Sequence, residues 1–210
     1  MIRMLIADDH EVVRRGLKQI LSDEFAPVKV FEAQNSQETL QQVTEHPFDL
    51  VLLDINMPGR SGLEVLAEVR RQRPNMPVLI LSASPEEDYA LRCIKLGAAG
   101  YVNKQSASDE LVSAVKKALG GGKYVTPSIA EKLAESFAGG IQQAPHESLS
   151  NRELQVLRLI AAGKTVKEIA SELCLSEKTI ATYRTRISEK MRLGTNVELT
   201  RYAIQHGLTD

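Results

Sequence analysis

The sequence predicts an α/β domain with a doubly wound, five-stranded parallel sheet, followed by an all-α domain of four helices. First, short apolar strands alternate with amphipathic helices over the first 120 residues, the order found in parallel sheets. Second, the run from Leu50 to Leu53 is apolar without alternation, which is typical of a strand covered on both faces. Third, helical spacing of apolar residues continues through four segments after residue 149. Together these patterns predict an α/β plus all-α chain.

The strands of the first domain are short runs, each followed by a helical pattern. They are predicted at residues 3–7, 28–33, 50–54, 78–81 and 101–102. The helix after the first strand carries apolar residues at roughly 3.6-residue spacing, namely Val12, Val13, Leu17, Ile20 and Leu21. The later helices are marked in the same way by Leu40 and Val43, by Leu63, Val65, Leu66 and Val69, by Leu91, Ile94 and Leu96, and by Leu111, Val112, Val115 and Leu119.

The composition is that of an ordinary globular protein, with 25% charged and 43% apolar residues. No apolar run approaches the roughly 20 residues of a membrane span, and the N-terminus leads directly into a strand. We therefore expect a cytoplasmic protein without a membrane partner. Cys93 and Cys174 lie 81 positions apart in helical patterns, which favours reduced core thiols over a disulfide or a metal pair.

The charge is distributed unevenly along the chain. Residues 1–148 hold 16 Lys and Arg against 20 Asp and Glu, whereas residues 149–210 hold 10 against 7. This asymmetry predicts two domains with different partners, the second binding a polyanion. Three consecutive glycines from Gly120 end the first domain, and Thr126-Pro127 begins a short helix. We expect domains at 1–120 and 149–210, joined by a linker at 121–148.

Polar residues follow several of the predicted strands. Parallel strands bring these residues to one edge of the sheet, where ligands bind in open α/β folds. They are Asp8, Asp9, Asp54, Ser82 and Lys104. Clustered carboxylates need a cation, and Mg²⁺ prefers such oxygen ligands. A metal, a lysine and a hydroxyl around Asp54 suit phosphoryl transfer to that carboxylate. Taken alone, an aspartate at a strand end is more often a turn cap.

This ordered set, with Pro58-Gly59 and Gly100-Tyr101-Val102, resembles the receiver domain of bacterial two-component response regulators, which has a flavodoxin- or CheY-like fold. Because of this resemblance, a functional role for Asp54 is favoured over that of a turn cap. It implies that Asp54 accepts a phosphoryl group from a sensor histidine kinase. Mg²⁺ would be held by Asp8, Asp9, Asp54 and the backbone carbonyl of Asn56. Ser82 and Lys104 would bind phosphoryl oxygens, and Tyr101 would swing inward upon activation.

The third helix of the second domain has two different faces. Ile180, Ile187 and Met191 point one way, whereas the other face is small, hydroxylated and cationic. Such a face suits the major groove of DNA, although a basic helix alone is more often a solvated surface. The segments Leu149-Ser150, Gly163-Lys164-Thr165 and Leu175-Ser176 with their neighbours resemble the LuxR-type helix-turn-helix. The whole chain is thus similar to NarL/FixJ-family response regulators, and to their GacA/UvrY branch.

This second resemblance implies a set of DNA-contacting residues and a dimer surface. The residues expected at DNA are Lys178, Thr179, Ala181, Thr182, Arg184, Thr185, Arg186 and Lys190. The last helix would supply a dimer surface with Val197, Leu199, Tyr202 and Ala203, although closing the domain core is an equally good role for Val197 and Leu199. Expected partners are a sensor histidine kinase, promoter DNA, a second copy of the phosphorylated chain and RNA polymerase.

The expected function is a DNA-binding transcriptional regulator that is switched by phosphorylation of Asp54 and is not a turnover enzyme. An aspartyl-phosphate phosphatase is one rival, but those enzymes carry a second aspartate two residues after the nucleophile, where this chain has Asn56. The other rival is a phosphorylation-independent transcription factor whose receiver serves only for interaction or dimerisation.

Overall fold

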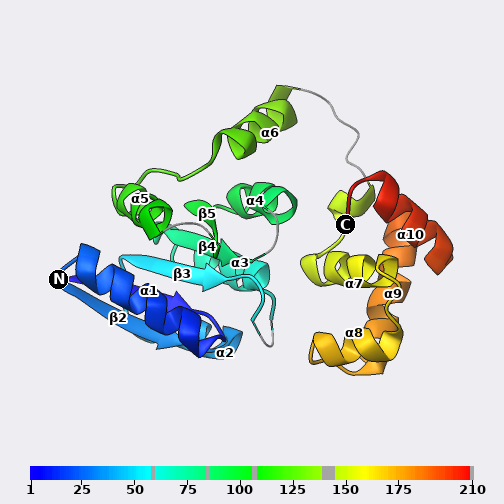
Figure 1. The fold of residues 1–210 in the computed structure, drawn as a ribbon, viewed down its shortest axis with the longest axis horizontal. Helices are drawn as coiled ribbons and strands as arrows, with labels where there is room; N and C mark the ends of the chain where they lie inside the picture. Colours follow the sequence, from blue (N-terminus) through cyan, green and yellow to red (C-terminus); the bar gives the residue numbers. More distant parts are fainter. Residues whose placement is uncertain (58–59, 84–85, 106–107, 139–144, 209–210) are drawn as a thin grey trace. The chain divides into compact units, whose positions relative to one another are not determined.

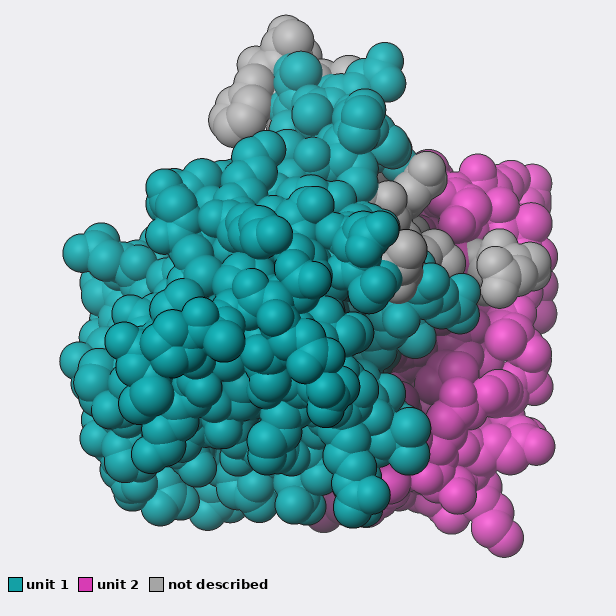
Figure 2. Space-filling view, turned by 60° about the vertical axis from the view of Figure 1, so that its left-hand side comes forward, with its two compact units in different colours: residues 1–138 teal, residues 139–210 magenta. Residues whose placement is uncertain are grey.

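The computed structural model describes residues 1–57, 60–83, 86–105, 108–138 and 145–208 (Figure 1). The chain divides into two compact units, Met1–Ala138 and Gly139–Asp210, which Figure 2 distinguishes by colour. Pro58 and Gly59 of the predicted turn, and most of the connector at 139–148, lie outside the described residues. Within the described ranges, no helix has the length and apolar character to cross a membrane.

Unit 1 is built on the predicted five-stranded parallel sheet. Its strands are β1 (Ile2–Ala7), β2 (Val28–Ala33), β3 (Leu50–Asp54), β4 (Val78–Ser82) and β5 (Gly100–Asn103). All pairings are parallel and the strand order is β2-β1-β3-β4-β5. The order reverses direction between β1 and β3, which is the doubly wound arrangement. The predicted fold class is confirmed.

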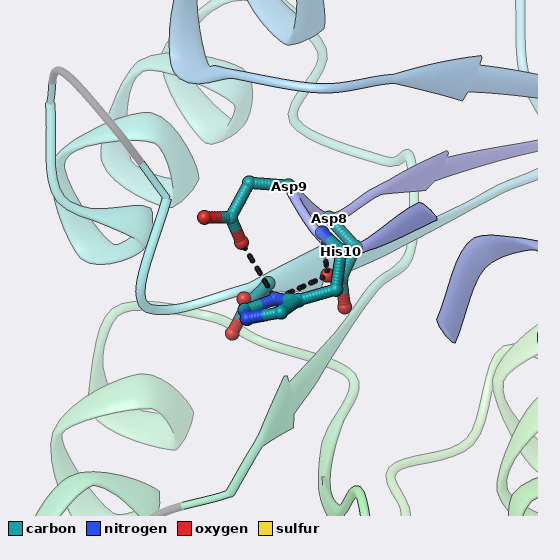
Figure 3. A group of neighbouring side chains, drawn as sticks. Asp8, Asp9 and His10 are labelled. Carbon is teal, nitrogen blue, oxygen red and sulfur yellow. Dashed lines mark hydrogen bonds and ion pairs between the residues drawn. The ribbon is translucent and has the colours of Figure 1, made fainter. Parts of the chain in front are cut away.

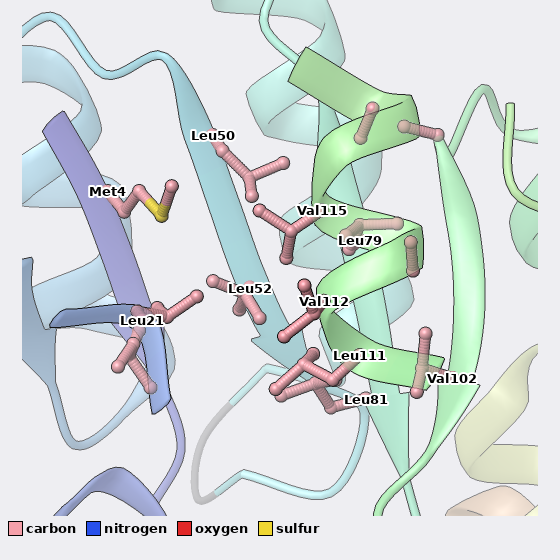
Figure 4. Packing of buried hydrophobic residues seen from close by; sticks show 14 of the residues in the cluster. Met4, Leu21, Leu50, Leu52, Leu79, Leu81, Val102, Leu111, Val112 and Val115 are labelled. Atoms are coloured by element: carbon pink, nitrogen blue, oxygen red, sulfur yellow. The ribbon is translucent and has the colours of Figure 1, made fainter. Parts of the chain in front are cut away.

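Five helices alternate with these strands. They are α1 (Glu11–Glu24), α2 (Ser36–Glu45), α3 (Gly62–Gln72), α4 (Glu86–Lys95) and α5 (Ser108–Leu119). On one face of the sheet, Leu50 and Leu52 pack in one cluster with Val112 and Val115 of α5 (Figure 4). Val51 and Leu53 are equally buried, and successive side chains of a strand point to opposite faces. Strand β3 is therefore covered on both faces, as its apolar run predicts.

Two residues that the helical spacing assigned to buried faces are exposed instead. Val12 lies in the first turn of α1 and is 83% exposed, and Leu96 follows the end of α4 and is 43% exposed. At about 100° per residue, Val12 lies half a turn around the helix from buried Leu21. Leu96 lies just beyond the end of α4, so the helical spacing that predicted its burial does not apply to it. Both assignments were wrong.

The segment after α5 remains attached to the sheet. Gly100 of β5 forms a parallel bridge with Tyr124, whose N–H donates to the carbonyl of Ala99 (2.7 Å). The helix α6 (Pro127–Ala138) then begins at Thr126, whose hydroxyl accepts from the Ile129 N–H (3.4 Å), and it packs against α4. Ile129 is buried. The helix of the predicted linker thus belongs to unit 1.

Unit 2 is helical throughout its described part. A short 3₁₀ turn η1 (Pro145–Ser148) precedes α7 (Asn151–Ala161), α8 (Val166–Glu172), α9 (Glu177–Met191) and α10 (Asn196–Gln205). Ser150, Thr165 and Thr195 each start a helix through a reciprocal capping box with the glutamate three residues later. This arrangement satisfies two backbone donors at each helix start. The side chains that close the core include Leu154, Leu157, Ile169, Ile180, Ile187 and Leu199.

Candidate phosphoacceptor site and DNA-binding helix

The polar strand ends of unit 1 meet at one edge of the sheet. Strands β1, β3 and β4 end at Ala7, Asp54 and Ser82, and Lys104 directly follows β5. The Lys104 N–H donates to the carbonyl of Ser82 (2.8 Å), which keeps the ends of β4 and β5 together. The structure therefore brings Asp8, Asp54 and Lys104 to the same place from three different strand ends.

Lys104 joins two of the carboxylates. Its Nζ lies 2.6 Å from Asp8 Oδ2 and 2.8 Å from Asp54 Oδ2. The side chains of both aspartates are almost completely buried, and that of Lys104 is 13% exposed. One ammonium thus faces two buried carboxylates, and the group retains a net negative charge.

The charge balance shifts the pKa values of this group. Burial raises the pKa of Asp54, and the neighbouring ammonium of Lys104 only partly offsets that effect. For Lys104, burial alone would lower the pKa, but the attraction of Asp54 and Asp8 outweighs it and the pKa is raised. The two carboxylates thus keep Lys104 in its charged form, whereas burial disfavours the ionised form of Asp54.

The backbone around Asp54 is fixed from two sides. The Asn56 N–H donates to Asp54 Oδ1 (3.1 Å), which orients the carboxylate. Gly62 lies against the same segment, because a Cβ added there would be 2.4 Å from the Asp54 carbonyl oxygen and 2.6 Å from Ile55 Cα. A glycine is therefore required where α3 begins beside the end of β3.

Two residues near this edge were not predicted as site residues. The Nη1 of Arg14 donates to the Asp8 carbonyl (2.8 Å), while its Nε donates to Glu32 Oε2 (3.3 Å), so this buried guanidinium ties α1 and β2 to the Asp8 turn. His10 Nδ1 lies 3.2 Å from Asp8 Oδ1 and 2.9 Å from Asp9 Oδ1 (Figure 3). Arg14 falls on the same helical face as Leu17 and Leu21. A charged residue on an otherwise apolar helix face indicates a buried side chain with a polar partner, so Arg14 could have been identified from the sequence.

The predicted switch residues are both buried. Ser82 is inaccessible at the end of β4, and Tyr101 is 1% exposed on β5. The aromatic side chain thus occupies an inward position. One potential ligand atom from each of Asp8, Asp9, His10 and Asp54 lies within 4.8 Å of the other three, close enough to surround one metal ion.

In unit 2, the small and cationic face of α9 is exposed as predicted. Lys178, Ala181, Thr182, Thr185 and Arg186 are exposed, opposite the buried residues Ile180, Ile187 and Met191. The hydroxyls of Thr182 and Thr185 donate to the carbonyls of Lys178 (3.0 Å) and Ala181 (3.1 Å). Because each hydroxyl is bonded to the helix backbone, the methyl group remains available to a ligand.

Two cationic residues of α9 also have contacts within unit 2. Lys190 Nζ forms an ion pair with Glu153 Oε2 (2.6 Å), and Arg184 Nε donates to Asn196 Oδ1 (2.7 Å). Thr179 is half-buried beside the Ser176 cap. These three residues therefore have structural roles within unit 2, besides the ligand contacts predicted for them.

The residues expected at a dimer surface on α10 differ in exposure. Leu199 and Ala203 are fully buried and close the core, so they present no surface to a partner. Val197 is 78% exposed, and Ile204 on the same helix is 63% exposed. Tyr202 is half-buried and its hydroxyl lies 2.8 Å from His146 Nδ1.

Comparisons with known proteins match both units. Residues 4–116 match the family described as response regulator receiver domain, and residues 147–203 match the bacterial regulatory proteins of the luxR family. The chain is 37% identical to the response regulator GacA of Pseudomonas viridiflava, over 100% of this chain and 99% of the relative. It is also 37% identical to the response regulator UvrY of Escherichia coli (strain K12), over 99% of this chain and 96% of the relative.

Among solved structures, RcsB from Salmonella enterica serovar Typhimurium, bound to promoter rprA in the presence of phosphomimetic BeF₃⁻, is similar with a TM-score of 0.63 and 27% identity, over 96% of this chain and 97% of that chain. Members of the matching family are generally not turnover enzymes. The arrangement of Asp8, Asp54 and Lys104 at one sheet edge and the exposed face of α9 agree with these matches. The chain belongs to the two-component response regulators that join a receiver domain to a LuxR-type DNA-binding domain, the family of GacA and UvrY.

Proposed function

We propose that Asp54 is the phosphoacceptor of this response regulator and that a sensor histidine kinase is the phosphodonor. The observation that carries the proposal is the contact of Lys104 Nζ with both Asp54 (2.8 Å) and Asp8 (2.6 Å). This ammonium is placed to neutralise charge on a group attached to Asp54. Burial raises the pKa of Asp54, so a cation beside this side chain would favour its ionised form.

The donor set around Asp54 fits Mg²⁺. Asp8 and Asp54 are buried carboxylates that one ammonium only partly neutralises, and the side chain of Asp9 is 28% exposed. Hard oxygen donors with residual negative charge are what Mg²⁺ prefers. We assign the ligand role to Asp8, Asp9, Asp54 and the backbone carbonyl of Asn56. When bound, the ion would neutralise charge on the transferring phosphoryl group.

The chemical step is an exchange of one bond for another. An oxygen of the Asp54 carboxylate attacks the phosphorus of a phosphohistidine on the kinase, so that a P–O bond forms as the P–N bond breaks. The electron pair of the broken bond returns to the imidazole of the kinase. Ser82 and Lys104 would then hold phosphoryl oxygens, and water would slowly release phosphate from Asp54.

The output of the switch is DNA binding by unit 2. The exposed residues of α9 would enter the major groove, with Ala181, Thr182 and Thr185 toward bases and Lys178 and Arg186 toward phosphates. Phosphorylation would favour a homodimer through α10 on paired half-sites, with RNA polymerase as a further partner at the promoter. We propose functional boundaries at 1–120 for the receiver domain, at 121–148 for the linker and at 149–210 for the DNA-binding domain. We also propose that the protein acts in the cytoplasm, where the chromosome lies.

Labelling with acetyl phosphate or with a phosphorylated kinase tests the proposal. Asp54→Asn should abolish labelling, whereas Asp23→Asn should not, because Asp23 is an exposed residue of α1 whose carboxylate accepts only from Gln19 in the described contacts. Labelling that survives in Asp54→Asn would refute the assignment. Omitting Mg²⁺ should also prevent labelling of the natural sequence.

A phosphorylation-independent regulator is the second candidate. A receiver of this kind would serve as an interaction module. The two candidates differ in one measurement: promoter affinity should rise upon phosphorylation in the first, and should be equal for the natural sequence and Asp54→Asn in the second.

A further inference from the structure

A hollow of about 740 Å³ lies at the edge of the sheet opposite to Asp54, where the strands begin. Its lining includes Ile2 of β1, Asp49 before β3 and Pro77 before β4. Because a strand rises about 3.3 Å per residue, Asp49 and Asp54 are about 16 Å apart along β3. The hollow is therefore separate from the pocket around Asp54, and its volume falls within the range of about 300–1,000 Å³ found for small-molecule sites.

Part of the lining is apolar. It comes from the starts of the strands and from the C-terminal turn of α5, and it consists of Ile2, Pro77, Ala99, Ala118 and Leu119. We call these five residues the apolar wall. Ala99 and Ala118 are buried and the other three are half-buried. A ligand that covered this wall would remove apolar surface from water, which is favourable.

The charged residues of the lining are two cations and one carboxylate. Arg70 is in the last turn of α3, and Lys123 follows the glycines after α5. Asp49 Oδ2 accepts from the backbone N–H of Arg3 (2.8 Å). Within the described residues, Arg70 Nη1 donates to the carbonyl of Met76 (3.4 Å), and neither Arg70 nor Lys123 forms an ion pair. The lining therefore has a net positive charge that no carboxylate neutralises.

Gly97 fixes the place of one of these cations. It follows α4 with φ +95°, a conformation that favours glycine. A Cβ at this position would lie 2.9 Å from Arg70 Nε, so the guanidinium occupies the space that a side chain would fill. A donor that is held in place before binding loses little freedom when a ligand arrives. Cations near helix C-termini also stabilise the helices, and that role needs no hollow beside them.

We propose that this hollow binds a small organic anion, with its charged group facing Arg70 and Lys123 and its apolar body on the apolar wall. The charged group is a carboxylate, a phosphate or a sulfonate, because guanidinium and ammonium groups donate to all three. The inference goes beyond the proposed function, since the site needs neither Asp54 nor Mg²⁺. A bound anion would join the end of α3 to the segment that leads through Tyr124 to α6.

Calorimetric titration of the full-length protein with naphthalene-2-sulfonate tests the proposal. This probe carries one anionic group on a flat apolar body, and it cannot phosphorylate Asp54. One molecule should bind per chain, and Asp54→Asn should bind it equally well. The neutral 2-naphthalenesulfonamide should bind at least about 10-fold more weakly, because hydrogen bonds to a charged group are the stronger ones. Absence of sulfonate binding, or equal affinity for the two probes, would overturn the proposal.

Substitution of the cations examines their role. Arg70→Gln and Lys123→Gln should each weaken sulfonate binding by about 10-fold. Arg71→Gln is the matched control, because Arg71 is exposed on the same helix, pairs with Glu68 and is not among the lining residues. Thermal unfolding without the probe measures the helix-stabilising role separately. If both cation variants bound the sulfonate as tightly as the natural sequence, the cations would have a structural role alone and the proposal would fail.

Nuclear magnetic resonance locates the bound probe. The amide signals of Ala99, Ala118 and Gly122, which line the hollow, should shift in proportion to its occupancy. Unit 2 offers the probe another cationic hollow, with Lys178 and Arg186 on α9. Shifts confined to α9 would mean that the probe binds the helix expected at DNA, and would refute a site at the start of the sheet.

Discussion

Lys104 Nζ lies 2.8 Å from Asp54 Oδ2, and the same atom contacts buried Asp8. Replacing this lysine by methionine should leave two buried carboxylates without their cation. Breaking a buried pair in this way costs about 3–5 kcal/mol, and we expect a loss of that order in the free energy of unfolding without metal. Mg²⁺ should restore part of it, whereas phosphorylation of Asp54 should fall by about 10²-fold or more.

Urea denaturation with and without Mg²⁺ measures this effect. Lys116→Met is the matched control, because its ammonium is 3.6 Å from Glu24 and both side chains are largely exposed. An exposed pair contributes at most about 1 kcal/mol. If Lys104→Met and Lys116→Met were equally stable, the buried bridge would have no energetic role.

Gly62 and Gly16 should respond to alanine in opposite directions. A Cβ at Gly62 would lie 2.4 Å from the Asp54 carbonyl oxygen, so Gly62→Ala should cost about 1–3 kcal/mol and displace the segment that carries Asp54. Gly16 lies within α1 and has no atom within 4 Å of an added Cβ. Gly16→Ala should therefore stabilise the protein by about 0.5–1 kcal/mol.

Thermal unfolding of the two variants and acetyl phosphate labelling examine both effects. Labelling should fall in Gly62→Ala and stay unchanged in Gly16→Ala. A Gly62→Ala protein that is as stable and as easily labelled as the natural sequence would show that the end of β3 tolerates a shift.

Glu153 should make the stability of unit 2 depend on pH in acid. Burial alone would raise the pKa of Glu153, but hydrogen bonds from Lys190 and Ser150 outweigh it and the pKa is lowered. A carboxyl with a lower pKa in the folded state stabilises that state above its unfolded pKa, near 4.5. The contribution should disappear as the pH falls below that value through the folded pKa.

Glu153→Gln should cost about 1–3 kcal/mol at neutral pH, because Lys190 and the cap of α7 lose a charged acceptor. The difference from the natural sequence should shrink below pH 4.5. Glu172→Gln, which removes an exposed partner of Lys164, should change stability by less than about 1 kcal/mol. Circular dichroism melts between neutral pH and pH 3 make the comparison, and a pH-independent cost would contradict the charge assignment.

Arg186 should contribute to DNA affinity through phosphate neutralisation. It is exposed on α9 beside Lys178 and Thr182, where these residues line a shallow hollow of about 300 Å³. Log affinity falls as log salt concentration rises, and Arg186→Ala should reduce the magnitude of that slope by about 0.9. Arg201→Ala, on the exposed face of α10, is the control and should keep the slope. Fluorescence anisotropy over a salt series measures both, and equal slopes would exclude a phosphate contact for Arg186.

Much of the fold and of the sheet edge around Asp54 could be predicted from sequence. The apolar run before Asp54 indicated a strand buried on both faces, and parallel strands necessarily bring their ends to one edge. Contacts between side chains of distant elements could not be predicted in this way. The bridge from Lys104 to Asp8 depends on strand order, and the link between Arg14 and Glu32 depends on the packing of α1 against β2.

Unit 2 illustrates the same limit. The periodicity of α9 separated its buried and exposed faces correctly, because that information is local to one helix. It did not reveal that Lys190 pairs with Glu153, 37 positions away, or that Leu199 and Ala203 are enclosed by neighbouring helices. Exposure on a helix surface is thus readable from one segment, whereas the partner of a charged side chain is not.

The capping boxes of unit 2 have a consequence for folding kinetics. Ser150, Thr165 and Thr195 each fix a helix start through a residue three positions away, whereas the sheet of unit 1 pairs segments that are far apart in sequence. Chains rich in local contacts fold faster, so stopped-flow refolding should show unit 2 completing before unit 1. During synthesis at 5–20 residues per second, the 72 residues after Ala138 take about 4–14 s. The slower unit is thus the one that leaves the ribosome first.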